Sequence, residues 1–390
     1  MRDLRSAYHE LVCSPAQLAL CRQAHSVADL LATLRSLWGV GDASDALLLQ
    51  AIDALNRQAL PDAVTADMAG LWLPRLYRVR SQRLHWCLPD GPATEPFHDE
   101  YLSRCWQGIL LNQLVTPQST LQGLTACRGR VPKAHPAGFI FHLSRCGSTL
   151  LSGCLSELDN AVVFSESPVL TELLLDPALS PQEKRAHIAG LIDLKASLFP
   201  GRRVVVKWNA WDIYQWDLLR GLYPSVPVVA LVRDPAQILA SHHAQAGRHM
   251  SGDPSMAGVA PVFSPSAGVA SLLEHRMRVL EGLMERMLPL KALPGVAVFD
   301  YPHLRSETLA QIARMFSLRC DAAGQRRIEQ RMQRNAKLPG TRFQPDSARK
   351  AAVFEASERG TIERRLSSLH RQLAPLPQQI TSRQELVDVC

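Results

Sequence analysis

The sequence lacks the features that mark several large classes of protein. Its nine cysteines are an odd number spread from Cys13 to Cys390, and no two have the Cys-x-x-Cys spacing of a zinc or redox site. We expect reduced thiols that mostly fill the core. The longest apolar runs, such as Val226 to Val232, are too short to span a bilayer, and Met1 to Cys13 has no apolar signal segment. A cytoplasmic protein without a membrane partner is the expectation.

The sequence also lacks a large excess of charge of one sign. The formal net charge is +7 over 390 residues, and the Arg residues are spread along the chain. This balance favours a small anionic ligand over a nucleic-acid backbone as the partner. Apolar residues make up 46% and charged residues 20%, which are ordinary values for a globular protein. The length allows two domains, or one large α/β domain with a helical extension.

The first third of the chain is predicted to be mostly helical. Apolar residues recur at helical spacing between Ser26 and Gly39, from Leu47 to Leu55 and from Leu102 to Leu114. No catalytic motif occurs there. The segment Arg128 to Gly138 has two prolines and three basic residues, as expected of a linker. We therefore predict a helical region over 1–128 and a second domain over 138–390.

The pattern beyond this linker is typical of an α/β fold. Short apolar runs alternate with helical segments such as Ser148 to Leu158, which predicts a central parallel sheet flanked by helices. Ligands of such sheets bind at the carboxyl ends of the strands. The predicted strands are 139–143, 161–164, 203–206, 226–232 and 296–299.

The first predicted strand runs into a turn suited to an anion. Its residues are Arg145, Cys146, Gly147, Ser148 and Thr149. A helix N-terminus offers unpaired N–H groups, glycine allows close approach of the backbone, and arginine adds a permanent planar cation. The turn is not a Walker loop, because Ser148 stands where that motif has lysine and His142 where it has its first glycine.

This turn resembles the 5′-phosphosulfate loop of the sulfotransferase family, in its Arg-Ser-Gly-Ser-Thr-Leu-Leu form. Cys146 replaces the usual serine. The resemblance implies a P-loop-like sulfotransferase fold and the nucleotide 3′-phosphoadenosine-5′-phosphosulfate (PAPS), with 3′-phosphoadenosine-5′-phosphate (PAP) as product. It also implies that residues 145–149 bind the 5′ end of that nucleotide.

A second match follows the fourth predicted strand. Arg233 ends this strand and Ser241 stands eight residues on, which is similar to the 3′-phosphate motif of the family. Pro235 suits a helix start. The alternative is a surface Arg233 paired with Asp234 and an exposed Ser241. A third match covers residues 299–318, so the resemblance spans about 138–318, with a hint that 337–342 closes over the nucleotide.

The acceptor needs a base to take its proton. Cytosolic members of the family have Lys-Thr-His after the third strand, whereas this chain has Lys207-Trp208-Asn209 there. Carbohydrate- and tyrosine-directed members use a Glu after the second strand, and Glu166 stands in that position. The resemblance therefore implies Glu166 as base and Lys207 as stabiliser of charge on the bridging oxygen. Alternatives are His142 as base, a helix-entry role for Glu166, and a Lys207 that extends from a strand end to solvent.

The remaining features have mainly structural interpretations. Three histidines, His242, His243 and His249, are assigned to a solvated face rather than to a metal. Asp300 is the one acidic candidate for Mg²⁺ at a strand end, and no metal is required for transfer. The Gly-, Pro- and Ser-rich segment 251–268, before a helix expected over 269–288, is interpreted as a substrate lid.

The resemblance thus implies sulfuryl transfer from PAPS to a hydroxyl or amine of a small-molecule or sugar-like acceptor. Two other functions are compatible with parts of the pattern: a P-loop nucleotide kinase or ATPase, and a non-catalytic anion-binding module. The identity of the acceptor and the oligomeric state are left open.

Overall fold

A computed structural model describes residues 3–264, 271–344 and 347–374. The chain divides into two compact units, one made of 1–135 with 167–202 and the other of 136–166 with 203–390. The segment 167–202 therefore packs with the N-terminal residues although it lies far beyond the predicted linker. Among the described residues, no helix is long and apolar enough to cross a membrane.

The first unit is mostly helical, as expected. Helix α3 (Val27–Trp38) begins after its N-cap Ser26 and ends at Gly39, whose φ of 68° suits glycine, and α4 is Asp45–Asn56. The predicted helix over 102–114 is two helices, α6 (His98–Gly108) and α7 (Leu110–Leu114), because Ile109 is extended. The other helices are α1 (Leu4–Cys13), α2 (Pro15–Arg22), α5 (Asp62–Asp67), α8 (Leu121–Cys127), α10 (Pro168–Leu175) and α11 (Pro181–Ser197).

A small antiparallel sheet in the first unit was not predicted. Its strands are β1 (Leu73–Arg78), β2 (Arg83–Cys87) and β3 (Gln118–Ser119), paired in the order β1-β2-β3. The register of β1 on β2 shifts between Pro74 and Leu76. A proline and several arginines in short strands obscure the alternation that would predict them.

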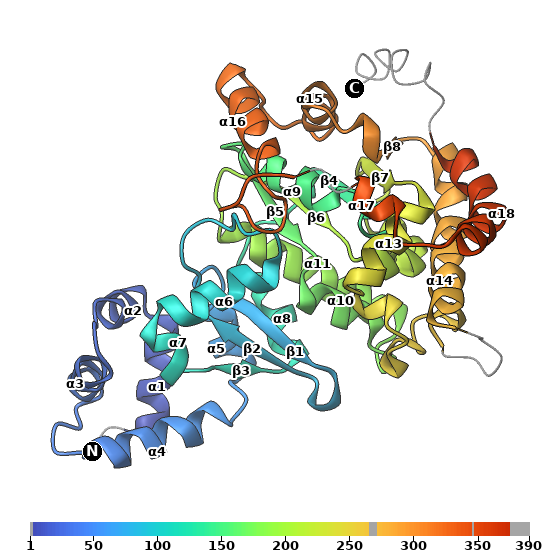
Figure 1. Cartoon of the computed structure of the whole chain (residues 1–390). Helices are drawn as coiled ribbons and strands as arrows, with labels where there is room; N and C mark the ends of the chain where they lie inside the picture. The colour runs from blue at the N-terminus through green and yellow to red at the C-terminus, as the bar shows by residue number, and fades with distance from the viewer. Residues whose placement is uncertain (1–2, 265–270, 345–346, 375–390) are drawn as a thin grey trace. The chain divides into compact units, whose positions relative to one another are not determined.

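The second unit is built on a parallel sheet of five strands in the order β5-β6-β4-β7-β8 (Figure 1). All five predicted strands are present, so the expected α/β class is confirmed. The strand β4 pairs with β6 on one side and with β7 on the other, which brings three carboxyl ends together in the middle of the sheet. The strands are β4 (Gly138–His142), β5 (Ala161–Ser165), β6 (Arg203–Lys207), β7 (Val228–Val232) and β8 (Val296–Asp300).

Helices of the second unit form two groups around this sheet. Helices α15 and α16 pack on α9, whereas α13, α14 and α18 pack against one another (Figure 1). The predicted helix over 148–158 is α9, and the one expected over 269–288 is α14; residues 269 and 270 lie outside the described residues. The helices are α9 (Ser148–Ser156), α12 (Trp216–Leu222), α13 (Pro235–Ala244), α14 (Leu272–Met287), α15 (Ser306–Met315), α16 (Ala322–Met332), α17 (Ser347–Ala351) and α18 (Ala356–Leu373).

The core beneath the site is formed by β4, α9 and the late helices. Ile140, Leu151, Val229, Ile312 and Phe316 are fully buried together. Burying five such side chains contributes about 1.5 to 3 kcal/mol each. This packing fixes the turn between β4 and α9, on which the site is built.

Candidate functional site

The turn between β4 and α9 has the backbone of an anion-binding loop. Three of its residues have positive φ: Ser144 (66°), Arg145 (51°) and Gly147 (86°). Gly147 is the N-cap of α9 and no side chain caps this helix. A Cβ at Gly147 would lie 2.7 Å from the Tyr301 ring, so only glycine fits here. The first N–H groups of α9 are thus left for an external acceptor.

The side chains of this turn differ in what they can contact. Arg145 is half-buried and its Nη2 donates to the Gln245 carbonyl at 2.6 Å. Ser148 and Thr149 are buried at the start of α9. The Cys146 side chain is fully buried in the core, and burial raises its pKa to about 12. Cys146 therefore has only its backbone to offer a ligand.

Glu166, Lys207 and His142 meet at the ends of β5, β6 and β4. Lys207 Nζ lies 2.8 Å from Glu166 Oε1 and donates to Thr149 Oγ1 at 3.2 Å. His142 Nδ1 accepts the Ser144 N–H at 3.0 Å, so the neutral ring carries its proton on Nε2, 3.3 Å from the same Glu166 oxygen. The base and the cation implied by the sequence thus lie together beside the anion loop.

The backbone of Glu166 is unusual for its residue type. Its φ is 53°, and its N–H donates to the Lys207 carbonyl at 2.8 Å. A non-glycine residue in this conformation stores strain, of the kind found at functional sites. Its side chain points to Lys207 and His142, which is not what a simple helix-entry residue would do. Lys207 is fully buried, so the alternative of a lysine extending to solvent is wrong.

Electrostatics set the protonation of this trio. Burial raises the pKa of Glu166, but Lys207 and His142 outweigh it and hold the pKa well below its usual range. Burial lowers the pKa of His142, against the opposing effect of Glu166. At neutral pH the carboxylate is therefore charged and the imidazole neutral.

Arg233 at the end of β7 lies directly beside the anion loop. Its Nη1 donates to the Arg145 carbonyl at 3.2 Å, its Nε donates to Gln237 Oε1 at 2.9 Å, and its Cζ lies 4.0 Å from the Tyr301 ring centroid. It is 5% exposed and Asp234 instead caps α13, so the alternative of a surface Arg233–Asp234 pair is wrong. The two sequence motifs therefore meet in one place.

Ser241 lies on α13, one helical turn beyond Gln237. It is half-buried, not exposed as the alternative interpretation holds. Because residues four apart share a helix face, Ser241 follows the side chain that holds Arg233. Gln237 and Tyr301 were missed by the sequence reasoning, although Tyr301 directly follows a strand end and could have been found there.

A hairpin beyond α16 brings a further lysine to the site. Asn335 N donates to the Thr341 carbonyl, and the buried Arg331 donates to the carbonyls of Asn335 and Ala336. Burial first, and then Arg145, lower the pKa of Lys337 to about 8, while Glu166 raises it. Arg145 and Glu166 thus both influence the Lys337 ammonium group, while closure of 337–342 over a nucleotide stays a prediction.

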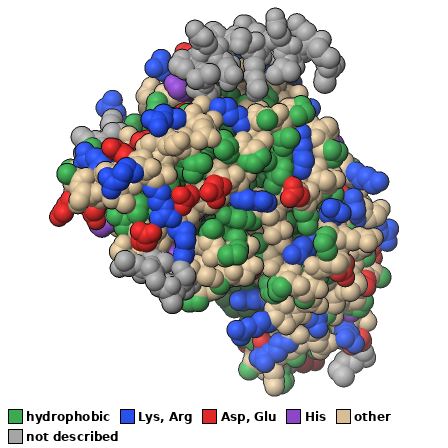
Figure 2. Space-filling view, turned by 90° about the vertical axis from the view of Figure 1, so that its right-hand side faces the viewer, with side chains coloured by type: hydrophobic (Ala, Val, Ile, Leu, Met, Phe, Trp, Pro, Cys, Tyr) green, Lys and Arg blue, Asp and Glu red, His purple; other side chains and the backbone are tan. Residues whose placement is uncertain are grey.

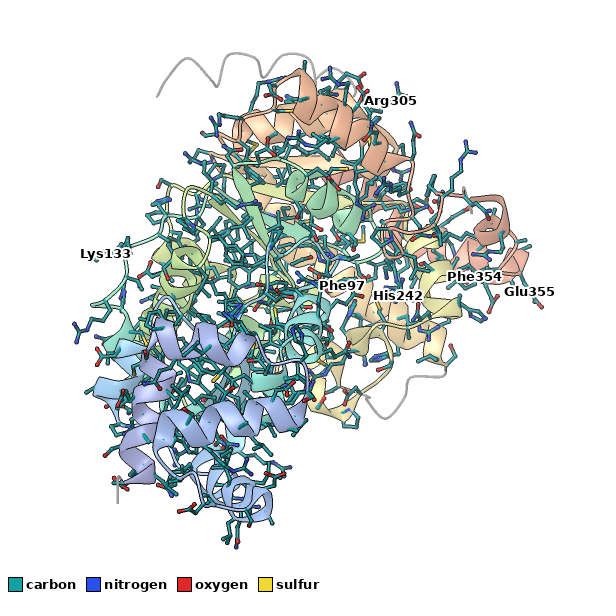
Figure 3. The ribbon with its side chains drawn as sticks, turned by 90° about the vertical axis from the view of Figure 1, so that its left-hand side faces the viewer. Phe97, Lys133, His242, Arg305, Phe354 and Glu355 are labelled. Carbon is teal, nitrogen blue, oxygen red and sulfur yellow. The ribbon has the colours of Figure 1, made fainter. Side chains whose placement is uncertain are left out.

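The expected solvated histidine face is wrong for two of its three members. His242 is fully buried and His249 is 4% exposed; only His243 faces solvent. The His243 ring lies 6.2 Å from that of Phe354, which is labelled together with His242 in Figure 3. Among the described residues, no group of three His, Cys, Asp or Glu side chains could hold a metal ion. Asp300 instead lies 3.3 Å from His370.

The predicted lid is described only in part. Residues 251–264 contain two short 3-10 turns, Pro254–Met256 and Pro261–Phe263, while 265–268 lie outside the described residues. A lid role stays a prediction. On the face shown in Figure 2, Lys and Arg side chains are scattered among hydrophobic and acidic ones.

Several solved structures resemble this chain. A sulfotransferase of Mycobacterium avium has a TM-score of 0.44 at 11% sequence identity, over 64% of this chain and 79% of that chain. A sulfotransferase of Alicyclobacillus acidocaldarius has a TM-score of 0.39 at 13% identity, over 62% of this chain and 98% of that chain. A third structure is retinol dehydratase in complex with androsterone and the inactive cofactor PAP. Its TM-score is 0.32 at 12% identity, over 66% of this chain and 88% of that chain. No protein-family model and no curated protein matches the sequence. Similarity at this level does not by itself assign a function.

Proposed function

We propose that this chain is a sulfotransferase that uses PAPS and transfers the sulfuryl group to a hydroxyl of an acceptor. The observation that carries the proposal is the hydrogen bond from Arg233 to the carbonyl of Arg145. It brings the two anion-binding motifs into one site, at neighbouring strand ends. A nucleotide with a phosphate at each end of its ribose requires two such adjacent cationic positions.

The residues present fit such a nucleotide. The uncapped start of α9 and the Arg145 side chain would hold the 5′ end, with Lys337 nearby. The buried guanidinium of Arg233, held by Gln237 and Tyr301, would hold the 3′-phosphate, with Ser241 on the same helix. When bound, PAPS supplies an activated sulfuryl group whose leaving group is a phosphate.

Glu166 is the proposed base. It would take the proton of the acceptor hydroxyl as the acceptor oxygen bonds to sulfur and the bond from sulfur to the 5′-phosphate oxygen breaks. The carboxylate is already ionised, so it is ready to accept that proton. Its low pKa, however, makes it a weak base while Lys207 remains 2.8 Å away.

In our proposal, binding of the nucleotide weakens the contact between Lys207 and Glu166. Lys207 Nζ contacts both Glu166 and Thr149, and Thr149 is the last residue of the anion loop, in the first turn of α9. A negatively charged 5′ group on this loop would attract Lys207 and weaken its hold on Glu166. The pKa of the carboxyl would then rise toward its ordinary range, and Lys207 would stabilise the charge that develops on the leaving oxygen.

The test compares ligands by thermal stabilisation and then by turnover. PAP without metal should raise the melting temperature, whereas ATP with Mg²⁺ should do so if the chain is a nucleotide kinase. At a hundred times its Kd, a ligand adds about 2.7 kcal/mol of stability. Isotopically labelled donor and a panel of acceptors, read by mass spectrometry, then test transfer. Stabilisation by ATP and Mg²⁺ alone would refute the proposal.

A further inference from the structure

A cluster of three aromatic side chains, two of them buried and one half-buried, includes a residue that closely follows Lys207 in the chain. Trp211 belongs to the 3-10 segment Ala210–Gln215 that begins three residues after Lys207. Its ring lies 5.3 Å from that of His249, which lies 5.4 Å from that of His242 at 86°. His242 lies in the last turn of α13, and His249 belongs to the short turn Arg248–Met250. Three segments of the second unit thus converge here.

This cluster holds polar atoms without hydrogen-bond partners. Within the described part of the chain, both ring nitrogens of His249, Nε2 of His242 and Nε1 of Trp211 are buried and unpaired. His242 Nδ1 accepts the Gly247 N–H at 3.1 Å, which leaves Nε2 as a donor. Most buried polar groups in proteins are paired, and an unpaired one costs about 1 to 3 kcal/mol. Four such atoms together indicate a place prepared for a polar ligand.

The cluster lies within electrostatic range of the base. Burial first, and then His142 and Arg145, lower the pKa of His249 to about 3, while Glu166 raises it. The His249 ring is therefore neutral at pH 7 and can donate from one nitrogen and accept at the other. The carbonyl of Gln245, which lies between His242 and His249 in the chain, accepts from Arg145, so a ligand at His249 would lie close to the anion loop.

We infer that this cluster is the acceptor subsite and that the acceptor is polyhydroxylated, like a sugar; the inference rests on the proposed function. One hydroxyl faces Glu166, while others pair with the unsatisfied nitrogens of His249, His242 and Trp211. A phenol or a simple alcohol has one hydroxyl, which Glu166 takes. It would leave the four nitrogens unpaired, so the cluster selects against it.

Entry of the acceptor requires movement of the turn that carries His249. This turn is flanked by Gly247 and by Gly252, whose φ is 75°. A Cβ at Gly247 would lie 3.2 Å from the His249 ring. Two glycines around one short turn give it the backbone freedom to swing outward.

The experiment measures acceptor binding by calorimetry to protein saturated with PAP. The probes are methyl glycosides, cyclohexanol and phenol. His249→Phe keeps an aromatic ring against Trp211 and removes both nitrogens, and Trp211→Phe keeps a smaller aromatic ring and removes Nε1. The matched control is His243→Phe, because His243 is an exposed histidine on α13.

We expect the wild type to bind a methyl glycoside more tightly than either single-hydroxyl probe. His249→Phe should weaken glycoside binding about tenfold to a hundredfold, and Trp211→Phe less, while His243→Phe matches the wild type. His249→Phe should also melt at the same temperature as the wild type or higher, because it removes unpaired buried nitrogens. A purely structural role would lower the melting temperature.

Two results would overturn the inference while the proposed function stands. One is binding of phenol or cyclohexanol as tight as that of the glycosides. The other is an unchanged glycoside affinity in both variants. Failure of PAP to bind would remove the proposed function itself.

Discussion

Glu166 is held between a buried lysine and a neutral histidine. Its proposed role as base can be tested by replacing its carboxylate with an amide of the same size. Glu166→Gln keeps the size of the side chain but cannot accept the acceptor proton. Turnover should fall about 10²- to 10⁴-fold. The affinity for PAP should be equal or higher, because Lys207 loses its competing carboxylate. Steady-state rates with labelled donor and calorimetry with PAP measure the two effects.

The control for this variant is Glu285→Gln, an exposed glutamate on α14. It should leave both quantities unchanged. If Glu166→Gln retained full turnover, Glu166 would not be the base, and His142 or another residue would have to take that role.

Arg233 offers a second prediction at the scale of one residue. Arg233→Ala removes the guanidinium held by Gln237 and Tyr301. PAP binding should weaken about tenfold to a hundredfold, whereas adenosine 5′-phosphate, which has a 3′-hydroxyl, should change little. Titration calorimetry with both nucleotides measures the difference. Arg371→Ala, at an exposed arginine in the last turn of α18, is the control, and equal losses for both nucleotides would refute the assignment of the 3′ site.

The turn between β4 and α9 allows a prediction at the scale of an element. Gly147→Ala places a Cβ 2.7 Å from the Tyr301 ring, at a φ of 86°. We expect a loss of about 1 to 3 kcal/mol in the free energy of unfolding, together with weaker PAP binding. Gly258→Ala, where a Cβ meets nothing within 4 Å, should be neutral. Chemical denaturation measures both, and a stable Gly147→Ala protein that binds PAP normally would contradict this account of the turn.

The elements also separate what the sequence can predict from what it cannot. The five strands of the parallel sheet were predictable because buried strands are continuous apolar runs bounded by polar residues. Strand β1 was not, because Pro74 and two arginines interrupt its pattern. The helix break at Ile109 directly follows Gly108, the last residue of α6, although the apolar spacing that predicts one helix continues across it.

The site follows the same division. Arg145, Glu166, Lys207 and Arg233 could be predicted as one site because they stand next to strand ends in the order that the resemblance requires. The burial of His242 and His249 was not predictable: they lie on a short helix and a single turn, where spacing does not tell which face is covered. Gln237 and Tyr301 act through Arg233, so they carry no motif of their own.

The molecule as a whole should lose stability as the pH falls below about 6.5. Burial lowers the pKa of His142, and it lowers that of His249 to about 3 and that of His242 to about 2, with help from neighbouring cations. Each ring takes up a proton in the unfolded chain from its ordinary value of 6.5 downward, but in the folded chain only at lower pH. The unfolded state therefore binds more protons in this window and is favoured by acid.

Each such histidine contributes a slope of up to about 1.4 kcal/mol per pH unit. Urea denaturation between pH 4 and 8 measures the sum. In His249→Phe the free energy of unfolding should depend less steeply on pH, by less than the uptake of one proton. His243→Phe should leave this pH dependence unchanged. A stability that is flat from pH 8 to pH 5 would contradict the buried, neutral state of these rings.

The middle place of β4 in its sheet has a consequence for how the chain is made. Lys207 and Arg233 come from strands that are synthesised long after β4, and Tyr301 later still. A nascent chain that ends at α9 contains the turn between β4 and α9 but lacks Lys207 and Arg233, which the neighbouring strands would bring beside it. The proposed affinity for PAP should thus arise late, once the ribosome has released residues beyond 301, and a truncated product of translation should not bind PAP.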